Sequence, residues 1–165
     1  MFTHKQLRRG FLVLALFVGL SVQACKTADT SDASATSMEQ SVFQQVNEFR
    51  VSRGLSKLEW DSRVADIARD HSRDMAQGRT PVGHDGFSDR VSAISAILSI
   101  RSAGENVGMT SNLDSPSQVV LNAWKNSASH LENLMGDFQI TGVGICYDPG
   151  DDAWYFTQIY VQLRP

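Results

Sequence analysis

The sequence predicts an α+β domain in which helices cover a small antiparallel sheet. Apolar residues recur at helical spacing through much of the first two thirds of the chain. The end of the chain instead holds two apolar, β-forming runs, 140–147 and 154–163, separated by the turn-forming sequence Asp-Pro-Gly-Asp-Asp. Helices followed by a hairpin are typical of a sheet with helices packed on it.

The helical segments follow one another in chain order. Apolar residues at i, i+4 and i+7 predict a helix over 40–53, which Gly54 ends. Asp61 is a suitable N-cap for a second helix, which continues to Gly78. Residues 88–98 also have helical periodicity.

The later segments alternate between extended and helical structure. The Gly-rich stretch 80–86 is predicted to be a loop, and 104–108 to be extended. Ser115-Pro-Ser-Gln118 predicts a helix start, with serine as cap, proline in the first turn and glutamine three residues after the cap.

Composition and charge exclude some functions. The chain has 165 residues, of which 42% are apolar and 20% charged, as in one globular domain. Without Lys5, Arg8 and Arg9, the chain carries 12 basic and 18 acidic residues, a net charge of −6. An acidic body offers little surface for neutralising phosphates, and no glycine-rich phosphate loop is present. We therefore predict no nucleic-acid partner.

Residues 1–24 are predicted to be a signal peptide. A basic segment precedes the apolar run 11–20, which suits a secretory signal and is short for a membrane span. The following Ser-Val-Gln-Ala-Cys25 resembles a bacterial lipobox, which implies that Cys25 is lipidated and anchors the protein to a membrane. Lys26 favours the outer membrane if the host is Gram-negative. The alternative is ordinary cleavage after Ala24.

Cysteine content leaves two alternatives open. Cys25 and Cys146 are the only cysteines. If Cys25 carries lipid, Cys146 is a small buried residue in an apolar run; otherwise a disulfide between them can form in an oxidising compartment. Residues 25–38 are small and polar, which predicts a flexible tether before one domain over 39–165.

An ordered set of short motifs runs through this domain. It comprises Val46-Asn-Glu-Phe-Arg50, Gly83-His-Asp-Gly86, Ala103-Gly-Glu-Asn-Val107, His130-Leu-Glu-Asn133 and Thr141-Gly-Val-Gly144. In this order and spacing the set resembles the bacterial branch of the CAP superfamily, which includes cysteine-rich secretory, antigen 5 and pathogenesis-related proteins. Its shared module is often called the SCP domain. The resemblance covers about residues 40–163 and implies an α-β-α sandwich with a central cleft.

The resemblance also implies where the cleft residues lie. Many CAP members hold two histidines and two acidic residues there. The histidines match His84 and His130, and the first acid matches Glu105. The position of the second acid is occupied by Ser127, and serine is common there in bacterial members. Two neutral imidazoles and a carboxylate can bind a divalent ion, so we expect a weak Zn²⁺ site in which Glu105 orients a histidine. The alternative is a hydrogen-bonded cluster that shapes the cleft.

Two functional classes follow from these residues. A non-catalytic envelope module would bind a lipid, glycan, peptide or partner protein. A metal- or serine-dependent hydrolase would use metal-bound water or a serine beside His130, but the missing second acid favours binding. We therefore expect an exported, lipid-anchored protein of the cell envelope without catalysis. His71, on the apolar stripe of the second helix, is predicted to be a core residue with one nitrogen hydrogen-bonded.

Overall fold

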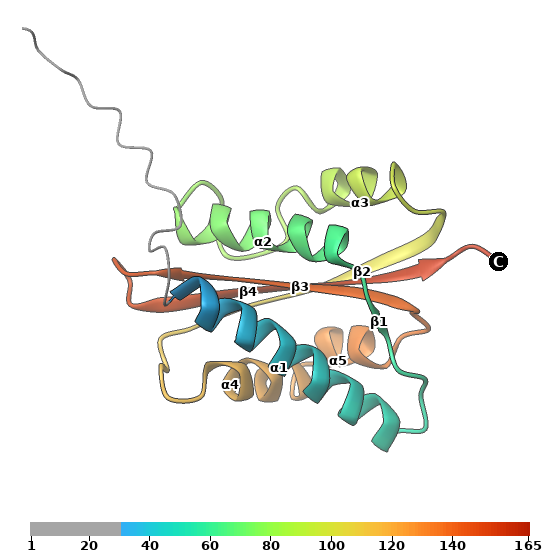
Figure 1. The fold of residues 1–165 in the computed structure, drawn as a ribbon, viewed down its shortest axis with the longest axis horizontal. Coiled ribbons are helices and arrows are strands. Elements are labelled where there is room, and N and C mark those ends of the chain that lie inside the picture. Colours follow the sequence, from blue (N-terminus) through green and yellow to red (C-terminus); the bar gives the residue numbers. More distant parts are fainter. Residues whose placement is uncertain (1–30) are drawn as a thin grey trace, which may run out of the picture.

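Helices lie on both faces of a four-stranded sheet in the computed structural model, which describes residues 31–165 (Figure 1). The strand order is β1-β3-β4-β2; β4 pairs antiparallel with β2 and β3, and β1 pairs parallel with β3. In chain order the elements are α1 (Ser31–Ser52), β1 (Glu59–Trp60), α2 (Ser62–Ala76), α3 (Phe87–Ser95), β2 (Ile100–Thr110), α4 (Pro116–Lys125), α5 (Ala128–Met135), β3 (Ile140–Asp148) and β4 (Ala153–Leu163).

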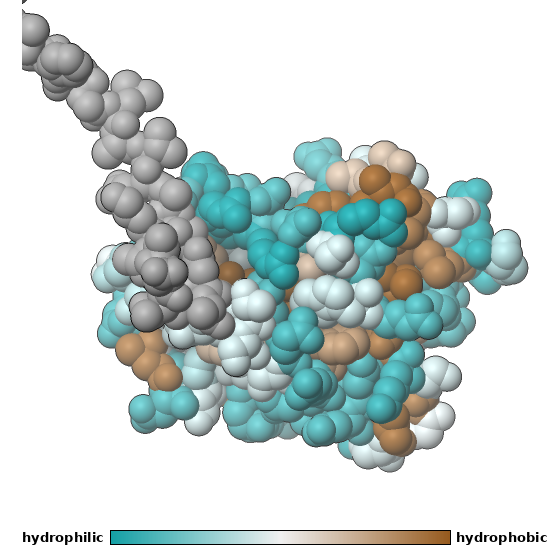
Figure 2. Space-filling model, viewed as in Figure 1, coloured by the Kyte–Doolittle hydropathy of each residue, from teal (hydrophilic) through white to brown (hydrophobic). Residues whose placement is uncertain are grey.

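The layers confirm the predicted α+β sandwich. Helices α2 and α3 cover one face of the sheet, and α1, α4 and α5 cover the other (Figure 1). One core cluster lies beneath the second layer and includes Trp124, Phe156 and Tyr160, each at most 1% exposed. A second cluster lies beneath α2 and α3, and a third includes Met75, Val107 and Tyr155. The surface seen in Figure 2 is largely hydrophilic, and one group of hydrophobic side chains lies over α3.

Two glycines let α2 lie directly on β3. A Cβ atom at Gly144 would stand 2.0 Å from the backbone nitrogen of Arg69, and one at Gly142 would stand 2.2 Å from that of Ala65. No side chain fits between this helix and this strand, so the two glycines set the position of α2 on the sheet.

Two buried charges attach α1 to the rest of the fold. Glu39 accepts two hydrogen bonds from Arg69 of α2, at 2.8 and 2.7 Å, and one from the backbone N–H of Ile145 at 3.1 Å. Arg50 is 2% exposed and donates to backbone carbonyls. The three shortest of these bonds end on the carbonyl oxygens of Ser56 (2.9 Å), Leu134 (3.0 Å) and Gly136 (2.9 Å).

The N-terminal boundary differs from the sequence prediction. Helix α1 begins at Ser31, which corrects the predicted flexible tether over residues 31–38. Ala35 and Met38 pack against the core, and this tertiary contact stabilises helical turns whose small polar residues favour them only weakly. The predicted signal peptide and Cys25 lie outside the described residues. Within residues 31–165, no helix is long and apolar enough to cross a membrane.

The helix caps were predicted with mixed success. Asp61 caps α2 as expected, since its side chain accepts hydrogen bonds from two backbone N–H groups of the first turn. Helix α4 starts at Pro116 as expected, but the side chain of Ser115 makes no capping hydrogen bond. Gln118 instead donates to Asn122 one turn further on.

Candidate functional site at the edge of the sheet

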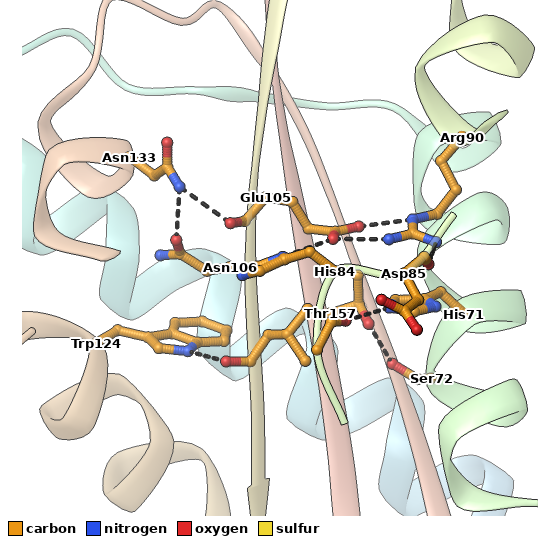
Figure 3. A network of polar contacts seen from close by, with 12 residues as sticks. His71, Ser72, His84, Asp85, Arg90, Glu105, Asn106, Trp124, Asn133 and Thr157 are labelled. Atoms are coloured by element: carbon orange, nitrogen blue, oxygen red, sulfur yellow. Dashed lines mark hydrogen bonds and ion pairs between the residues drawn. The ribbon is translucent and has the colours of Figure 1, made fainter. Parts of the chain in front are cut away.

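Glu105 lies on β2, one of the two edge strands of the sheet, and its side chain is 1% exposed. Successive side chains of a strand point to opposite faces. Glu105 accordingly points toward the α2 and α3 layer, whereas Asn106 points toward α4 and α5 (Figure 3). A carboxylate buried this deeply requires hydrogen-bonding or charged partners.

Two residues supply these partners. His84 Nδ1 lies 2.9 Å from Glu105 Oε1. Arg90, on α3, donates from Nε to Oε2 at 2.7 Å and from Nη2 to Oε1 at 2.8 Å, a bidentate pair (Figure 3). We call His84, Arg90 and Glu105 the β2 cluster. The sequence predicted that Glu105 would orient a histidine, but it did not identify Arg90.

The contact with Glu105 determines how His84 presents its ring. With Nδ1 facing a carboxylate, the neutral ring carries its proton on Nδ1 and leaves Nε2 as an acceptor. The side chain of His84 is 53% exposed. The cluster therefore offers an oriented, accessible imidazole backed by a buried carboxylate.

His71 holds the loop that carries His84. It is 3% exposed on α2, and its Nε2 lies 2.8 Å from the carbonyl oxygen of Gly83. Burial lowers the pKa of His71, and the hydrogen bond to Gly83 opposes this shift only in part. A neutral ring donates from Nε2 to the carbonyl, so the predicted core role of His71 is confirmed.

His130 reaches β2 from the opposite layer. It lies on α5, and its carbonyl oxygen accepts a hydrogen bond from Asn106 Nδ2 at 3.1 Å. Its ring Nδ1 is buried and has no hydrogen-bond partner among the described residues. Burial and, secondarily, the charge of His84 lower the pKa of His130.

The two serines beside His130 do not form a nucleophile–base pair. Ser127 Oγ lies 3.4 Å from Ser129 Oγ. Within residues 31–165, no hydrogen bond joins either hydroxyl to His84 or His130. Ser127 precedes α5 in an extended conformation, with no capping hydrogen bond from its side chain.

Side chains from α4 and α5 cover the outer edge of β2. Asn133 Nδ2 donates to the carbonyl oxygen of Glu105 at 3.0 Å and to Asn106 Oδ1 at 2.9 Å. Trp124 Nε1 donates to the carbonyl oxygen of Val107 at 3.0 Å. These bonds satisfy carbonyls that an edge strand would otherwise leave unpaired. They also fix the backbone that carries Glu105.

The arrangement does not suit a divalent metal ion. In the described part of the chain, no three His, Cys, Asp or Glu side chains form a group that could hold one. The carboxylate oxygens of Glu105 are engaged by His84 and Arg90, and a guanidinium beside them repels a cation. The Zn²⁺ site expected from the sequence thus remains a prediction, and the contacts of Glu105 count against it.

Cys146 bears on the predicted anchor. It lies on β3, is 3% exposed and is disulfide-bonded. Cys25 is the only other cysteine of the sequence, and it lies outside the described residues. Lipidation and a disulfide use the same sulfur atom, so a single Cys25 cannot carry both.

The fold and the site define an α-β-α sandwich domain with a His–Glu pair at the edge of its sheet. Residues 43–160 match the family described as the cysteine-rich secretory protein family, CAP. The chain belongs to this family. This confirms the family that the sequence motifs indicated.

Similar proteins come from several bacteria. The chain is 30% identical over 132 residues to an uncharacterized membrane protein of Bacillus subtilis, YlbC, covering 77% of this chain and 35% of YlbC. It is 26% identical to YkwD of the same organism, covering 81% of this chain and 51% of YkwD. The chain thus spans about a third of YlbC and about half of YkwD.

Solved structures show the same fold. An extracellular protein containing an SCP domain from Bacillus anthracis has a TM-score of 0.70 and 29% identity, covering 83% of this chain and 44% of that one. An outer surface protein from Borrelia burgdorferi has a TM-score of 0.67 and 21% identity, covering 79% and 96%. At that identity, the second likeness concerns the fold alone.

Proposed function

We propose that this chain is an exported CAP-domain protein of the bacterial cell envelope that binds a ligand without catalysis. The β2 cluster is the observation that carries the proposal. It holds an exposed imidazole in one orientation, and among residues 31–165 no serine, threonine or cysteine hydrogen-bonds to that ring. An export route is supported by the predicted signal peptide and by the extracellular relative from B. anthracis.

The exposed atom of the cluster indicates the class of ligand. Nε2 of neutral His84 accepts a hydrogen bond, so it suits a ligand that carries hydroxyl or amide N–H groups. Glycans and peptides have many such groups, whereas lipid chains have none. We therefore favour a glycan or peptide over the lipid that the sequence left open.

A hydrolase is the second candidate, and one observation favours it. A histidine oriented by a carboxylate is the base of many hydrolytic sites. His84 and Glu105 form that pair at 2.9 Å. The pair would still require a nucleophile, and in the described part of the chain no serine, threonine or cysteine hydrogen-bonds to His84. Binding therefore accounts for more of the observed contacts.

One titration separates the two candidates. Soluble peptidoglycan fragments, which carry both glycan and peptide groups, are added to ¹⁵N-labelled protein, and the same mixtures are analysed by mass spectrometry for cleavage. We expect saturable shifts for amides of residues 83–90 and 103–107 without any product. These shifts should disappear in His84→Ala and persist in Lys57→Ala, a matched change at an exposed position on another loop. Product formed by the wild type and lost in His84→Ala would instead establish the hydrolase.

Attachment to the outer membrane through a lipidated Cys25 is proposed on the sequence alone. The alternative that the sequence leaves open is a disulfide between Cys25 and Cys146. Intact mass spectrometry of mature protein from the membrane fraction decides between the two. Added acyl chains on a peptide beginning at Cys25 support the anchor. An unlipidated chain whose mass rises by two hydrogens on reduction contradicts it.

A further inference from the structure

We propose that the guanidinium of Arg90 binds the Glu105 carboxylate in place of a divalent metal ion. The β2 cluster therefore forms without a metal ion and excludes one. This inference does not depend on which ligand the site binds or on whether the site is catalytic. It concerns which positive charge neutralises Glu105.

The burial of Glu105 makes a cationic partner necessary. An ionised carboxylate that is 1% exposed is costly unless a cation compensates it. A bound metal ion is one cation that could serve this purpose. Here Arg90 does so with two parallel hydrogen bonds, and its own side chain is 11% exposed. A planar guanidinium matches both oxygens at once, which a point charge cannot do.

Arg90 is also held in place from the other side. Its Nη1 donates to the carbonyl oxygen of Asp85 at 2.8 Å, and its guanidinium lies 5.9 Å from the centre of the Phe87 ring. The loop closes around it at Gly86, whose φ of 74° favours glycine and whose added Cβ would stand 3.4 Å from Arg90 Nη1. An incoming metal ion would have to displace a side chain fixed by three hydrogen bonds.

The remaining donors are too few to hold a metal without Glu105. His84 directs one ring nitrogen toward the carboxylate, and His130 lies across β2 on α5. Zinc sites in proteins use at least three protein ligands. With Arg90 on Glu105, the cluster offers two imidazoles at most. Removing Arg90 would free the third ligand.

The test is a calorimetric titration with Zn²⁺ alone. The wild type is compared with Arg90→Gln, the double variant Arg90→Gln/His84→Ala, and Arg101→Gln as a matched change at an exposed arginine of β2. We expect no saturable binding by the wild type or Arg101→Gln. Arg90→Gln should bind Zn²⁺ saturably, at least about a hundredfold more tightly than the detection limit that bounds the wild type, because a neighbouring positive charge no longer opposes the ion. The double variant should lose that gain.

Two results would overturn the proposal. One is micromolar Zn²⁺ binding by the wild type that His84→Ala abolishes. The other is a folded Arg90→Gln, as judged by circular dichroism, that binds no more tightly than the wild type. If Arg90→Gln does not fold, Arg90→Met takes its place, because methionine also removes the charge and keeps much of the side-chain volume. That variant should gain measurable affinity, and a folded Arg90→Met with none would equally overturn the proposal.

Discussion

Replacing Arg50 with methionine removes the buried charge that joins α1 to the end of α5. The guanidinium is 2% exposed and donates to three carbonyl oxygens at 2.9–3.0 Å. Methionine keeps much of the side-chain volume but donates nothing. The substitution therefore tests the hydrogen bonds more than the packing.

The size of the effect follows from which carbonyls lose their partner. Ser56 is exposed, so water can replace the bond to its carbonyl. Leu134 is buried and Gly136 is half-buried, and a buried acceptor without a partner costs about 1–3 kcal/mol. Arg50→Met should thus lower the free energy of unfolding by about 2–6 kcal/mol. For a domain of this size, each kcal/mol lowers the melting temperature by about 2–4 °C.

Urea denaturation followed by circular dichroism measures this difference. Arg53→Met is the matched control in the turn directly after α1, since Arg53 is exposed and its guanidinium only lies 5.1 Å from the Phe49 ring centre. We expect the control to lose less than about 1 kcal/mol. If Arg50→Met also stays within about 1 kcal/mol of the wild type with an unchanged denaturant slope, Arg50 does not hold α1 as inferred.

Three further changes test other contacts. Gly144→Ala forces a Cβ against the backbone of α2 and should cost about 1–3 kcal/mol or more, measured by urea denaturation. Burial lowers the pKa of His71, so the unfolded chain binds more protons than the folded one below about pH 6.5, and the free energy of unfolding falls as the pH drops. His71→Gln should weaken this dependence of the unfolding free energy on pH, measured by urea denaturation at pH 5 to 8. Asn133→Ala removes the donor to the Glu105 carbonyl and should speed amide hydrogen exchange along β2, and unchanged exchange would contradict a role in covering the edge.

The elements with strong periodicity could be predicted from the sequence. The two apolar runs at the end of the chain became β3 and β4, joined by the predicted turn. Helix α2 was recognised from its apolar stripe and the Asp61 cap. In each case, short-range pattern and local chemistry determine the structure.

Features that depend on tertiary contact could not be predicted in this way. The first turns of α1 consist of small polar residues, and their helical form depends on contacts of Ala35 and Met38 with distant parts of the core. The two-residue strand β1 pairs with β3, which lies far away in the sequence. Neither contact leaves a local pattern in the chain.

In the candidate site too, some residues could be predicted from the sequence and others could not. Family motifs identified His84 and Glu105, which the fold brings to 2.9 Å, and also His130, which the fold places on the other side of β2. Arg90 was missed because an arginine on a short helix has the same local sequence whether it faces water or a buried carboxylate. The available signal was the position of Arg90 in the sequence, between the loop that carries His84 and the strand that carries Glu105.

The ring nitrogens of His84 provide the most direct test of a metal-free β2 cluster. Long-range ¹H–¹⁵N spectra of the wild-type protein distinguish the two neutral tautomers and report metal coordination. The cluster described here predicts that the neutral ring of His84 carries its proton on Nδ1, with nitrogen shifts that stay the same after treatment with EDTA and after addition of Zn²⁺. A ring protonated on Nε2, or Zn²⁺-induced shifts of His84 and His130 together, would contradict it.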